Sequence, residues 1–291
     1  MRSFAGKQIV LTGAASGIGR ALALQLAEEG ALLHLVDVNQ DGLNELAGQI
    51  SNAVAAVWQC DLSSATDIDR WLDQLAAFPS PMDGLINNAG VAYYGATDAM
   101  TMQQWDWLMN INLSAPIRIT QRLLPALMQR PDAHIVNMCS ISGLVAGGRF
   151  AAYHTSKFGL VGFTEAIRAE FGRKGIGVTA ICPGPVQTAL YDSAESANTD
   201  KAVPNPPAWV CTTAEKVAAK TINAMRKNKR QVLITPMAHG LFQMKKFVPG
   251  LIDFANQFSR KKKRRIKELQ QQEEARLAGI TEPPSRNSKA A

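Results

Sequence analysis

Tyr153 and Lys157 stand four places apart in the stretch YHTSK, and Ser140 lies thirteen residues before the tyrosine. On a helix, side chains four residues apart share one face, so the phenol and the ammonium are expected to lie together. A unit charge at ~4 Å is worth up to ~4 kcal/mol at an effective dielectric of ~20, which lowers the pKa of a tyrosine from ~10 by about three units. Such a phenol can exchange protons near neutral pH, although the same pair also occurs on solvated helix faces.

Two histidines are the other acid–base candidates. His34 lies inside an apolar run that predicts a strand. His154 follows the tyrosine directly, which places it about 100° around the expected helix from the phenol. Neither histidine is expected to share the face of Tyr153, so the tyrosine is the preferred proton carrier.

The elements that must position these residues follow a regular pattern. Short apolar runs alternate with longer amphipathic stretches, which predicts a Rossmann-like, doubly wound α/β domain with a parallel sheet. Longer helical stretches are expected at 101–130 and 151–173, and another helix at the capping-box spacing of Thr212 and Glu215. The seven expected strands are 9–13, 32–37, 54–60, 84–90, 134–140, 176–184 and 231–236.

The stretch TGAASGIGR follows the first expected strand and opens the first expected helix. Its glycines, Gly13, Gly17 and Gly19, let backbone N–H groups approach a pyrophosphate at the positive end of a helix. A glycine trio alone is a weak signal, but a strand before it and a helix after it are the required context. We therefore predict a dinucleotide site, with a plain strand–helix turn as the alternative.

Asp37 closes the second expected strand and favours NAD as the dinucleotide. Its carboxylate is expected to accept hydrogen bonds from ribose hydroxyls and to repel the 2′-phosphate of NADP. Residues 14–16 and 38–40 include no Arg or Lys, and Arg20 is the nearby exception. Asp61, which closes the third expected strand, is either an adenine contact or the polar residue that begins the next helix.

Composition and charge narrow the class of protein. The chain has 291 residues, and residues 260–291 hold ten Lys or Arg and four acidic residues, a net +6 of the total +7. The nearly neutral remainder argues against binding to nucleic acid. The four cysteines have no metal-ligand or CxxC spacing, so we expect reduced thiols in the cytoplasm and no metal. No leader peptide is expected before residue 10, and no apolar stretch reaches the length of a membrane span.

These motifs resemble those of the short-chain dehydrogenase/reductase superfamily across about residues 3–236. The TGxxxGxG turn is 12–19, the NNAG motif is 87–90, the PG motif is 183–184, and Ser140, Tyr153 and Lys157 have the catalytic spacing. The resemblance implies a single α/β domain with oxidoreductase activity. It also implies a homodimer or homotetramer built through the helices expected at 101–130 and 151–173.

Carried over residue by residue, the resemblance makes Tyr153 the general acid/base. Lys157 then lowers the pKa of the phenol and holds the nicotinamide ribose, Ser140 positions the substrate oxygen, and Asn112 of NINLSA holds a water beside the lysine. The implied substrate residues are Ser140 and Tyr153, and Tyr191, an aromatic residue of the lid expected at about 187–210, is a further substrate candidate. The implied cofactor-binding residues are Gly13, Ser16, Gly17, Ile18, Gly19, Asp37, Asp61, Leu62, Asn88, Ala89, Gly90, Tyr153, Lys157, Pro183, Val186 and Thr188.

Loops are expected to set the substrate class. Tyr93, Tyr94, the apolar stretch 144–150 and a lid at about 187–210 suggest a hydrophobic pocket. We therefore expect an NAD(H)-dependent enzyme that interconverts a secondary alcohol and a ketone of steroid-, retinoid- or lipid-like character. The alternatives are a reductase of small carbonyl compounds, a non-catalytic NAD(H)-sensing or scaffold protein, and dehydratase or epimerase chemistry on the same fold.

The C-terminal part departs from the family pattern. Apolar residues recur at helical spacing in 237–258, and the basic run RKKKRR occupies 260–265. The expected domains are the catalytic domain at 1–236, an amphipathic and basic helical extension at 237–270, and a disordered tail at 271–291. An apolar stripe beside a basic cluster predicts peripheral contact with an anionic membrane surface. The alternatives are a helix docked on the body or on a second subunit, followed by a solvated charge run, and a nuclear-import-like signal.

Overall fold

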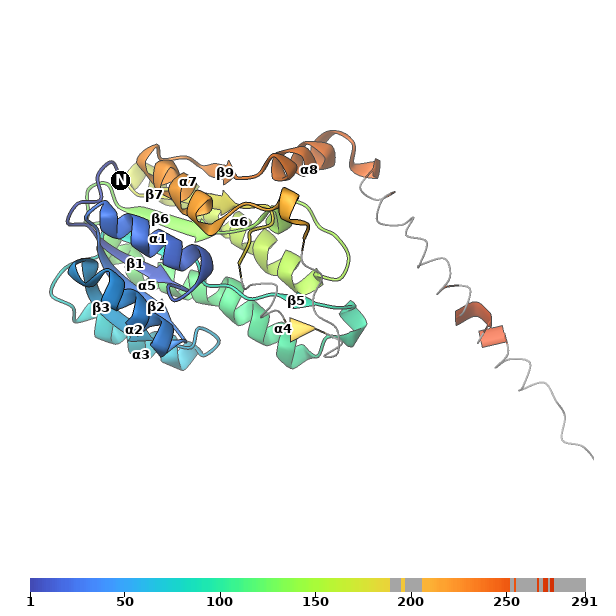
Figure 1. The fold of residues 1–291 in the computed structure, drawn as a ribbon, viewed down its shortest axis with the longest axis horizontal. Helices are drawn as coiled ribbons and strands as arrows, with labels where there is room; N and C mark the ends of the chain where they lie inside the picture. Colours follow the sequence, from blue (N-terminus) through green and yellow to red (C-terminus); the bar gives the residue numbers. More distant parts are fainter. Residues whose placement is uncertain are drawn as a thin grey trace, which may run out of the picture. The chain divides into compact units, whose positions relative to one another are not determined.

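The structure is a computed structural model that describes residues 1–188, 195–196, 206–251, 254, 266, 269–271 and 273–274. Its main sheet has the strands β1 Gln8–Thr12, β2 Leu32–Asp37, β3 Val54–Gln59, β4 Gly84–Asn87, β6 His134–Met138, β7 Gly177–Cys182 and β9 Gln231–Leu233. All seven are parallel, in the order β3-β2-β1-β4-β6-β7-β9 (Figure 1). The predicted Rossmann-like, doubly wound fold is confirmed.

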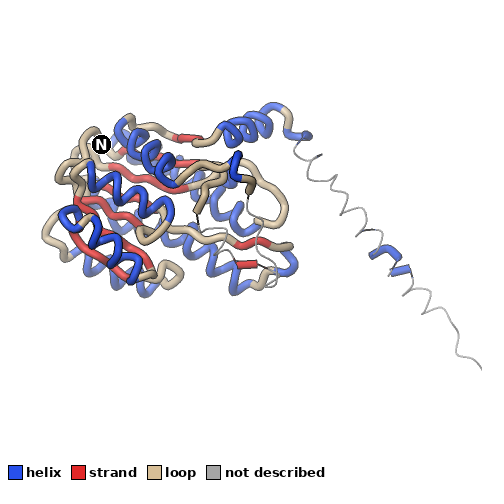
Figure 2. Tube along the Cα trace, in the orientation of Figure 1, coloured by secondary structure: helices blue, strands red, loops and turns tan. Residues whose placement is uncertain are grey.

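The strands form because their side chains are apolar on both faces. Every residue of β1, with the sequence QIVLT, is buried, and so is every residue of β7. Helices on both sides of a parallel sheet take both faces out of water, so its strands read as continuous apolar runs. Figure 2 shows the strands between helical layers. This double burial explains why the strands were predictable from short apolar runs.

Helices cover the two faces of the sheet in two groups. The α-helices of the described chain are α1 Gly17–Glu28, α2 Gln40–Gln49, α3 Ala65–Ala76, α4 Met102–Met109, α5 Ala115–Leu127, α6 Ala151–Phe171, α7 Ala214–Arg226 and α8 Pro236–Phe247, of which α1 and α7 lie in one group and α3 and α5 in the other. Leu22 of α1 and Val217 of α7 belong to one apolar cluster, whereas Trp71 of α3 and Ile119 of α5 belong to another. Because successive side chains of β1 alternate between these clusters, the sheet is the layer that joins them.

The helical stretch predicted at 101–130 is interrupted in its middle. Helix α4 begins at a capping box formed by Thr101 and Gln104, and a π-helical turn at Asn110–Ser114 joins it to α5. Such a turn changes the direction in which side chains leave the helix, and π turns are frequent at functional sites. The buried residue of this turn is Asn112.

Helix α7 begins one residue later than the capping-box spacing predicted. Its cap is Thr213, whose side chain accepts from the Lys216 backbone N–H at 3.4 Å. The predicted cap, Thr212, instead uses its backbone N–H for Pro185 and its carbonyl for Gln187. Thr212 is therefore held as an extended bridge to the segment after β7, and the prediction that it caps the helix was wrong.

The strand order reverses between β1 and β4. From β1 the sheet continues through β2 to β3, and from β4 it continues the other way through β6 and β7 to β9. The connections that leave the carboxyl ends of β1 and β4 therefore diverge. In open parallel sheets this divergence leaves the crevice in which ligands bind.

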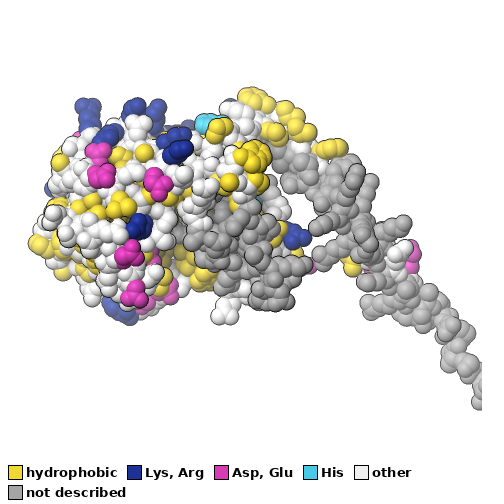
Figure 3. All heavy atoms as spheres, viewed as in Figure 1, with side chains coloured by type: hydrophobic (Ala, Val, Ile, Leu, Met, Phe, Trp, Pro, Cys, Tyr) yellow, Lys and Arg dark blue, Asp and Glu magenta, His cyan; other side chains and the backbone are white. Residues whose placement is uncertain are grey.

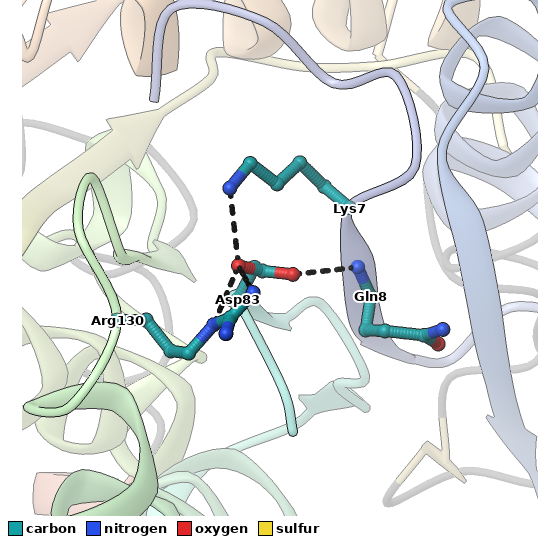
Figure 4. Close-up of polar contacts among 4 residues, drawn as sticks. All are labelled: Lys7, Gln8, Asp83 and Arg130. Atoms are coloured by element: carbon teal, nitrogen blue, oxygen red, sulfur yellow. Dashed lines mark hydrogen bonds and ion pairs between the residues drawn. The ribbon is translucent and has the colours of Figure 1, made fainter. Parts of the chain in front are cut away.

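At the amino ends of β1 and β4, a buried carboxylate ties the same two strands together (Figure 4). Asp83, directly before β4, is 1% exposed and accepts hydrogen bonds from Lys7 at 3.2 Å, the Gln8 backbone N–H at 3.0 Å and Arg130 at 2.9 Å. Burial opposes ionisation, but these hydrogen bonds outweigh it and hold the pKa of Asp83 below its ordinary value. This ionic cluster therefore stabilises the central strand pair from the end opposite the crevice.

The chain divides into a compact unit over Met1–Phe242 and a second over Gln243–Ala291. The domain boundaries predicted at 236 and 270 stay predictions. Of the predicted lid, β8 at Glu195–Ser196 pairs with β5 at Tyr93–Tyr94, whereas Tyr191 lies outside the described residues. No helix within the described part of the chain combines the length and apolar character that crossing a membrane requires.

Candidate active site

A cavity of about 830 Å³ lies in the crevice, among the segments that follow the carboxyl ends of the strands. Its volume falls in the usual range for small-molecule and cofactor sites, about 300–1,000 Å³. The predicted site residues that line it are Gly13, Ser16, Gly17, Ile18, Asp37, Asp61, Leu62, Asn88, Ala89, Gly90, Ser140, Tyr153, Lys157, Pro183, Val186 and Thr188. Of the other predicted residues that the structure describes, Gly19 and Asn112 stand behind this lining.

The turn between β1 and α1 is built so closely that only glycine fits it. Gly13 has φ +66°, and a Cβ there would lie 2.8 Å from the Cα of Ala89. A Cβ on Gly19 would lie 1.8 Å from the carbonyl oxygen of Gly13. Gly17 has φ +51°, which a larger side chain would strain. The turn therefore exposes backbone at the start of α1, as a bound pyrophosphate needs, and it fits a dinucleotide.

The NNAG segment braces this turn from the neighbouring strand. The hydroxyl oxygen of Thr12 accepts from the backbone N–H groups of Asn88 at 3.0 Å and Ala89 at 3.2 Å. The Asn88 amide donates to the carbonyls of Thr12 and Gly13, each at 3.1 Å. These four hydrogen bonds cross the β1–β4 switch point, so the two loops that bound the crevice are held as one unit.

Asp37 leaves β2 at the edge of the cavity and is half-buried. Its Oδ2 accepts from the Ala15 backbone N–H and its Oδ1 from the Asn39 backbone N–H, both at 3.0 Å. A carboxylate has about four acceptor positions, so two remain for hydroxyl groups of a ligand. Arg20 is turned away toward α2, where it donates to Gln49 at 2.8 Å. The part of the cavity around Asp37 thus offers acceptors, and the described chain brings no arginine or lysine to it.

Lys157, on α6, lines the cavity although it is almost fully buried. Its ammonium donates to the Met138 carbonyl at 2.9 Å, and burial lowers its pKa because an apolar surrounding penalises the charge. A Cβ on Gly90 would lie 3.3 Å from both the Lys157 ammonium and the Asn112 Oδ1. Because Gly90 has no side chain, the Lys157 ammonium and the Asn112 Oδ1 border the same small space beside it.

The π turn explains how Asn112 reaches that place. Its Oδ1 accepts from the Val91 backbone N–H at 2.8 Å, and its Nδ2 donates to the Val91 carbonyl at 2.9 Å and the Ser156 hydroxyl at 3.2 Å. Asn112 therefore fixes the chain just after the NNAG motif to the helix that carries Lys157. Asn110, at the start of the same turn, instead donates to the Ser63 carbonyl at 3.4 Å.

Ser140 and Tyr153 line the cavity from two different elements. Ser140 follows β6 in an extended conformation, and its hydroxyl oxygen accepts from the Ser142 N–H at 3.1 Å. Tyr153 lies in the first turn of α6, and the Lys157 ammonium stands 5.7 Å from the centroid of its ring. The spacing read from the sequence is thus realised as a serine hydroxyl, a phenol and an ammonium around one cavity.

Sequence reasoning did not find several apolar residues of the lining. Among them are Val91, Ile141 and Met237, whereas Pro206 and Pro207, which also line the cavity, fall within the lid predicted at about 187–210. Met237 stands near the start of α8, just beyond the predicted end of the domain, and no motif marks it. The aromatic part of the lining was anticipated in part: Tyr94 and Phe150 line the cavity with 5.0 Å between ring centroids, whereas the predicted Tyr93 is buried outside the described lining and donates its hydroxyl to the Ala99 carbonyl.

Comparison with known proteins then decides the family. A family model described as short chain dehydrogenase matches residues 7–199, more than half of the chain. The chain belongs to the short chain dehydrogenase family. The D-threitol dehydrogenase of Mycolicibacterium smegmatis is 37% identical to this short chain dehydrogenase over 187 residues, which are 64% of this chain and 72% of that protein.

Two solved structures agree with the fold. A short chain dehydrogenase/reductase from Burkholderia phymatum, solved with NAD, has TM-score 0.75 and 26% identity over 86% of this chain and 96% of that one. A short-chain dehydrogenase from Sphingobium yanoikuyae, solved with NADPH, has TM-score 0.72 and 23% identity over 87% and 98%. As a short chain dehydrogenase, the protein is an oxidoreductase that acts on CH–OH groups. Because one neighbour holds NAD and the other NADPH, the fold alone does not choose between the two cofactors.

Proposed function

We propose that this short chain dehydrogenase is an NAD(H)-dependent oxidoreductase that interconverts a hydrophobic secondary alcohol and its ketone. The observation that carries the proposal is that Ser140, Tyr153 and Lys157 line the same cavity as Asp37 and the glycine-rich turn. A single cavity can therefore hold a dinucleotide and a substrate in contact. Asp37 in one part of the cavity suits the recognition of ribose hydroxyls. The group of Ser140, Tyr153 and Lys157 in the other part suits proton transfer.

The residues of this chain divide the proposed reaction among them. The bound nicotinamide would supply or accept the hydride. Tyr153 would give a proton to the substrate oxygen during reduction and take it back during oxidation, while the Ser140 hydroxyl would donate a hydrogen bond to the same oxygen. The Lys157 ammonium, 5.7 Å from the tyrosine ring, attracts the negative charge of a phenolate. The space beside Gly90, between Asn112 and Lys157, suits a water that relays the proton outward.

We propose NAD rather than NADP as the cofactor, with Asp37 as the residue that decides. The free acceptor positions of Asp37 suit the two hydroxyls of an adenosine ribose, and its negative charge opposes a 2′-phosphate. Val38 lines the cavity next to it and offers no positive charge. Asp61 and Leu62, which also line the cavity, are proposed to border the adenine.

The apolar part of the lining supports a hydrophobic substrate. Tyr94, Phe150, Pro206, Pro207 and Met237 line the cavity together with Tyr153. The test is turnover at 340 nm with NADH and NADPH against ketones and secondary alcohols that range from small to steroid- or lipid-sized. Rising kcat/KM with apolar size supports the proposal, and activity confined to small polar compounds contradicts it.

A second candidate is an enzyme of small polyols or carbonyl compounds. It is favoured by the 37% identity with a D-threitol dehydrogenase. The same panel separates the two candidates when it includes four-carbon polyols. A scaffold or NAD(H)-sensing role without turnover is less well supported, because the serine, tyrosine and lysine that chemistry needs are all present around the cavity.

We also propose that the C-terminal extension holds this enzyme at an anionic membrane surface in the cytoplasm. Phe247, Val248 and Leu251 are 70%, 53% and 48% exposed, and the exposed Lys245 and Lys246 precede them. Figure 3 shows hydrophobic side chains gathered over α8. Apolar side chains beside lysines suit the boundary between lipid headgroups and acyl chains.

Vesicle sedimentation tests the membrane proposal. The protein is expected to sediment with phosphatidylserine vesicles, less with phosphatidylcholine vesicles, and less at high salt. The double substitution F247S/L251S should release it, whereas W209S, which removes an 86% exposed apolar side chain from the short turn Ala208–Val210, should not. Equal sedimentation of both variants would contradict the proposal that the C-terminal extension binds the membrane.

We propose, from the family resemblance, that the enzyme assembles as a homodimer or homotetramer through α4, α5 and α6. Met102 on α4 and Phe158 on α6 are exposed apolar side chains on these helices, which supports the proposal. Light scattering coupled to size exclusion measures the subunit number directly. A monomer at micromolar concentration would contradict it.

A further inference from the structure

The stretch 144–150, here named the substrate loop, joins two residues of the cavity wall. Ser142 stands just before it and Phe150 at its end, and both line the cavity. The apex of the loop, 146–148, is exposed and contains the pair Gly147 and Gly148. A Cβ added to either glycine would meet nothing within 4 Å, so packing does not hold the apex in place. Backbone this free has a large entropy to lose, and something else must order it.

His154 makes the side-chain contacts that hold the apex of this loop, while the Arg149 carbonyl near its end accepts from the Gly95 backbone N–H at 2.9 Å. Its Nε2 accepts from the Gly147 backbone N–H at 3.0 Å, and its Nδ1 bonds the Ser142 carbonyl at 2.9 Å. Its ring also lies edge-on to Phe150, with 6.3 Å between centroids. One side chain therefore contacts the segment just before the loop, the apex of the loop and its last residue. His154 itself stands behind the described lining of the cavity, so it is not placed to touch substrate.

The two hydrogen bonds assign the protons of the imidazole. Because the Gly147 N–H can only donate, Nε2 must carry a lone pair, and because the Ser142 carbonyl can only accept, Nδ1 must carry the hydrogen. His154 is thus bound as a neutral ring that donates on one side and accepts on the other. A general acid/base would need one of these nitrogens open toward the cavity.

We propose that His154 is a positioning residue that clamps the substrate loop and so shapes the wall that bulky substrates contact. The inference rests on the proposed function for the identity of the substrate, but the clamp itself does not depend on it. Phe150 lies 5.0 Å from Tyr94 and 6.3 Å from Tyr153, centroid to centroid, so its position decides how much room remains beside the phenol. A small substrate that contacts only Ser140 and Tyr153 does not touch Phe150, so its turnover should not depend on the position of this wall.

Two isosteric variants separate the two hydrogen bonds. In H154N the amide nitrogen takes the position of Nδ1 and keeps the bond to Ser142, but nothing reaches the Gly147 N–H. In H154Q the amide oxygen takes the position of Nε2 and keeps an acceptor for Gly147. The matched control is G147A, which retains the N–H and has open space for its methyl group.

The experiment pairs hydrogen exchange with substrate kinetics. In H154N, exchange of the Gly147 amide should accelerate at least tenfold, KM for bulky substrates should rise about five- to tenfold, and kcat/KM for the smallest active substrate should stay within twofold. H154Q should keep exchange slow, and G147A should match the wild type in both readouts. Unchanged exchange in H154N, or equal losses for small and bulky substrates, would overturn the inference.

Hydrogen exchange needs neither substrate nor cofactor, so the two proposals can fail separately. Faster exchange in H154N together with no turnover by the wild type on any compound supports the clamp and contradicts the proposed function. Turnover by the wild type together with unchanged exchange in H154N supports the function and contradicts the clamp.

Discussion

Replacing Asp37 by asparagine tests how the cavity chooses its cofactor. The variant D37N keeps the volume of the side chain and one acceptor oxygen, and it removes the negative charge. The Ala15 and Asn39 N–H groups, each 3.0 Å from a carboxylate oxygen, hold the side chain at the cavity edge. An asparagine keeps an acceptor for only one of these two N–H groups, so D37N removes both the negative charge that a bound ribose would meet and one of the hydrogen bonds that hold the side chain.

The magnitude follows from two terms. Hydrogen bonds to charged acceptors contribute about 1.5–3 kcal/mol and those to neutral acceptors about 0.5–1.5, so the loss for NAD is about 1.4 kcal/mol, or tenfold. Two unit charges about 5 Å apart repel by roughly 3 kcal/mol at an effective dielectric near 20, and screening of a half-buried carboxylate reduces this to ~2 kcal/mol, or ~30-fold. Together, the preference for NAD over NADP should fall by about 300-fold.

The assay is the ratio of kcat/KM with NAD to that with NADP, at fixed ionic strength and saturating substrate. The control is D41N, which removes an equal charge from the exposed first turn of α2, outside the described cavity lining. The control should leave the ratio within twofold. A D37N ratio equal to that of the wild type would refute the assignment of Asp37 to ribose recognition.

Two further predictions concern stability. Because the pKa of Asp83 is depressed in the fold, its contribution is complete above the unfolded-state pKa of ~3.9 and is lost as pH falls through the lower folded value. In urea unfolding at pH 7, D83N should lower the free energy of unfolding by about 2–4 kcal/mol, and this difference from the wild type should shrink below pH 4. The control D69N removes one partner of the exposed ion pair with Arg118 and should lower the free energy of unfolding by less than ~1 kcal/mol. G19A should destabilise by about 3 kcal/mol or more, since its methyl carbon would lie 1.8 Å from a backbone oxygen, while G48A, in open space on α2, should be neutral or stabilising by up to ~1 kcal/mol. Equal effects within either pair of variants would contradict the packing described here.

The sheet was well predicted from the sequence because strands that are buried on both faces consist mainly of apolar residues, which appear as short apolar runs. It was less accurate at the ends of the strands. The run predicted at 84–90 is a strand only as far as Asn87, because the Asn88 amide and N–H turn to Thr12 instead of continuing the ladder. Tertiary hydrogen bonds of this kind leave no local pattern, so no propensity or period could reveal them.

The candidate site was predictable where a residue acts through its type and spacing. The glycine-rich turn, Asp37, Ser140, Tyr153 and Lys157 all line one cavity. The π turn that aims Asn112 was not predictable, since it changes the helix geometry by a single residue. Met237 was missed for another reason: it lies beyond the last strand, and an apolar residue at the start of a helix reads as ordinary packing.

The ionic cluster of Asp83 was also missed. Its partners Lys7 and Arg130 lie 76 and 47 residues away along the chain. An aspartate before a strand reads as a surface loop residue, and the sequence does not indicate that three segments meet there. Only the three-dimensional arrangement shows that this carboxylate is buried and paired (Figure 4).

The most direct test of the account removes one oxygen atom from Tyr153. We predict that Y153F still binds NADH, by fluorescence titration, but loses at least ~1,000-fold in kcat with the best substrate of the panel, because the proton carrier is gone. Y93F is the matched control, since the Tyr93 hydroxyl donates to the Ala99 carbonyl at 3.3 Å, away from the described cavity lining, and it should keep turnover within a fewfold. Turnover by Y153F close to that of the wild type would contradict the central claim that this phenol carries the proton.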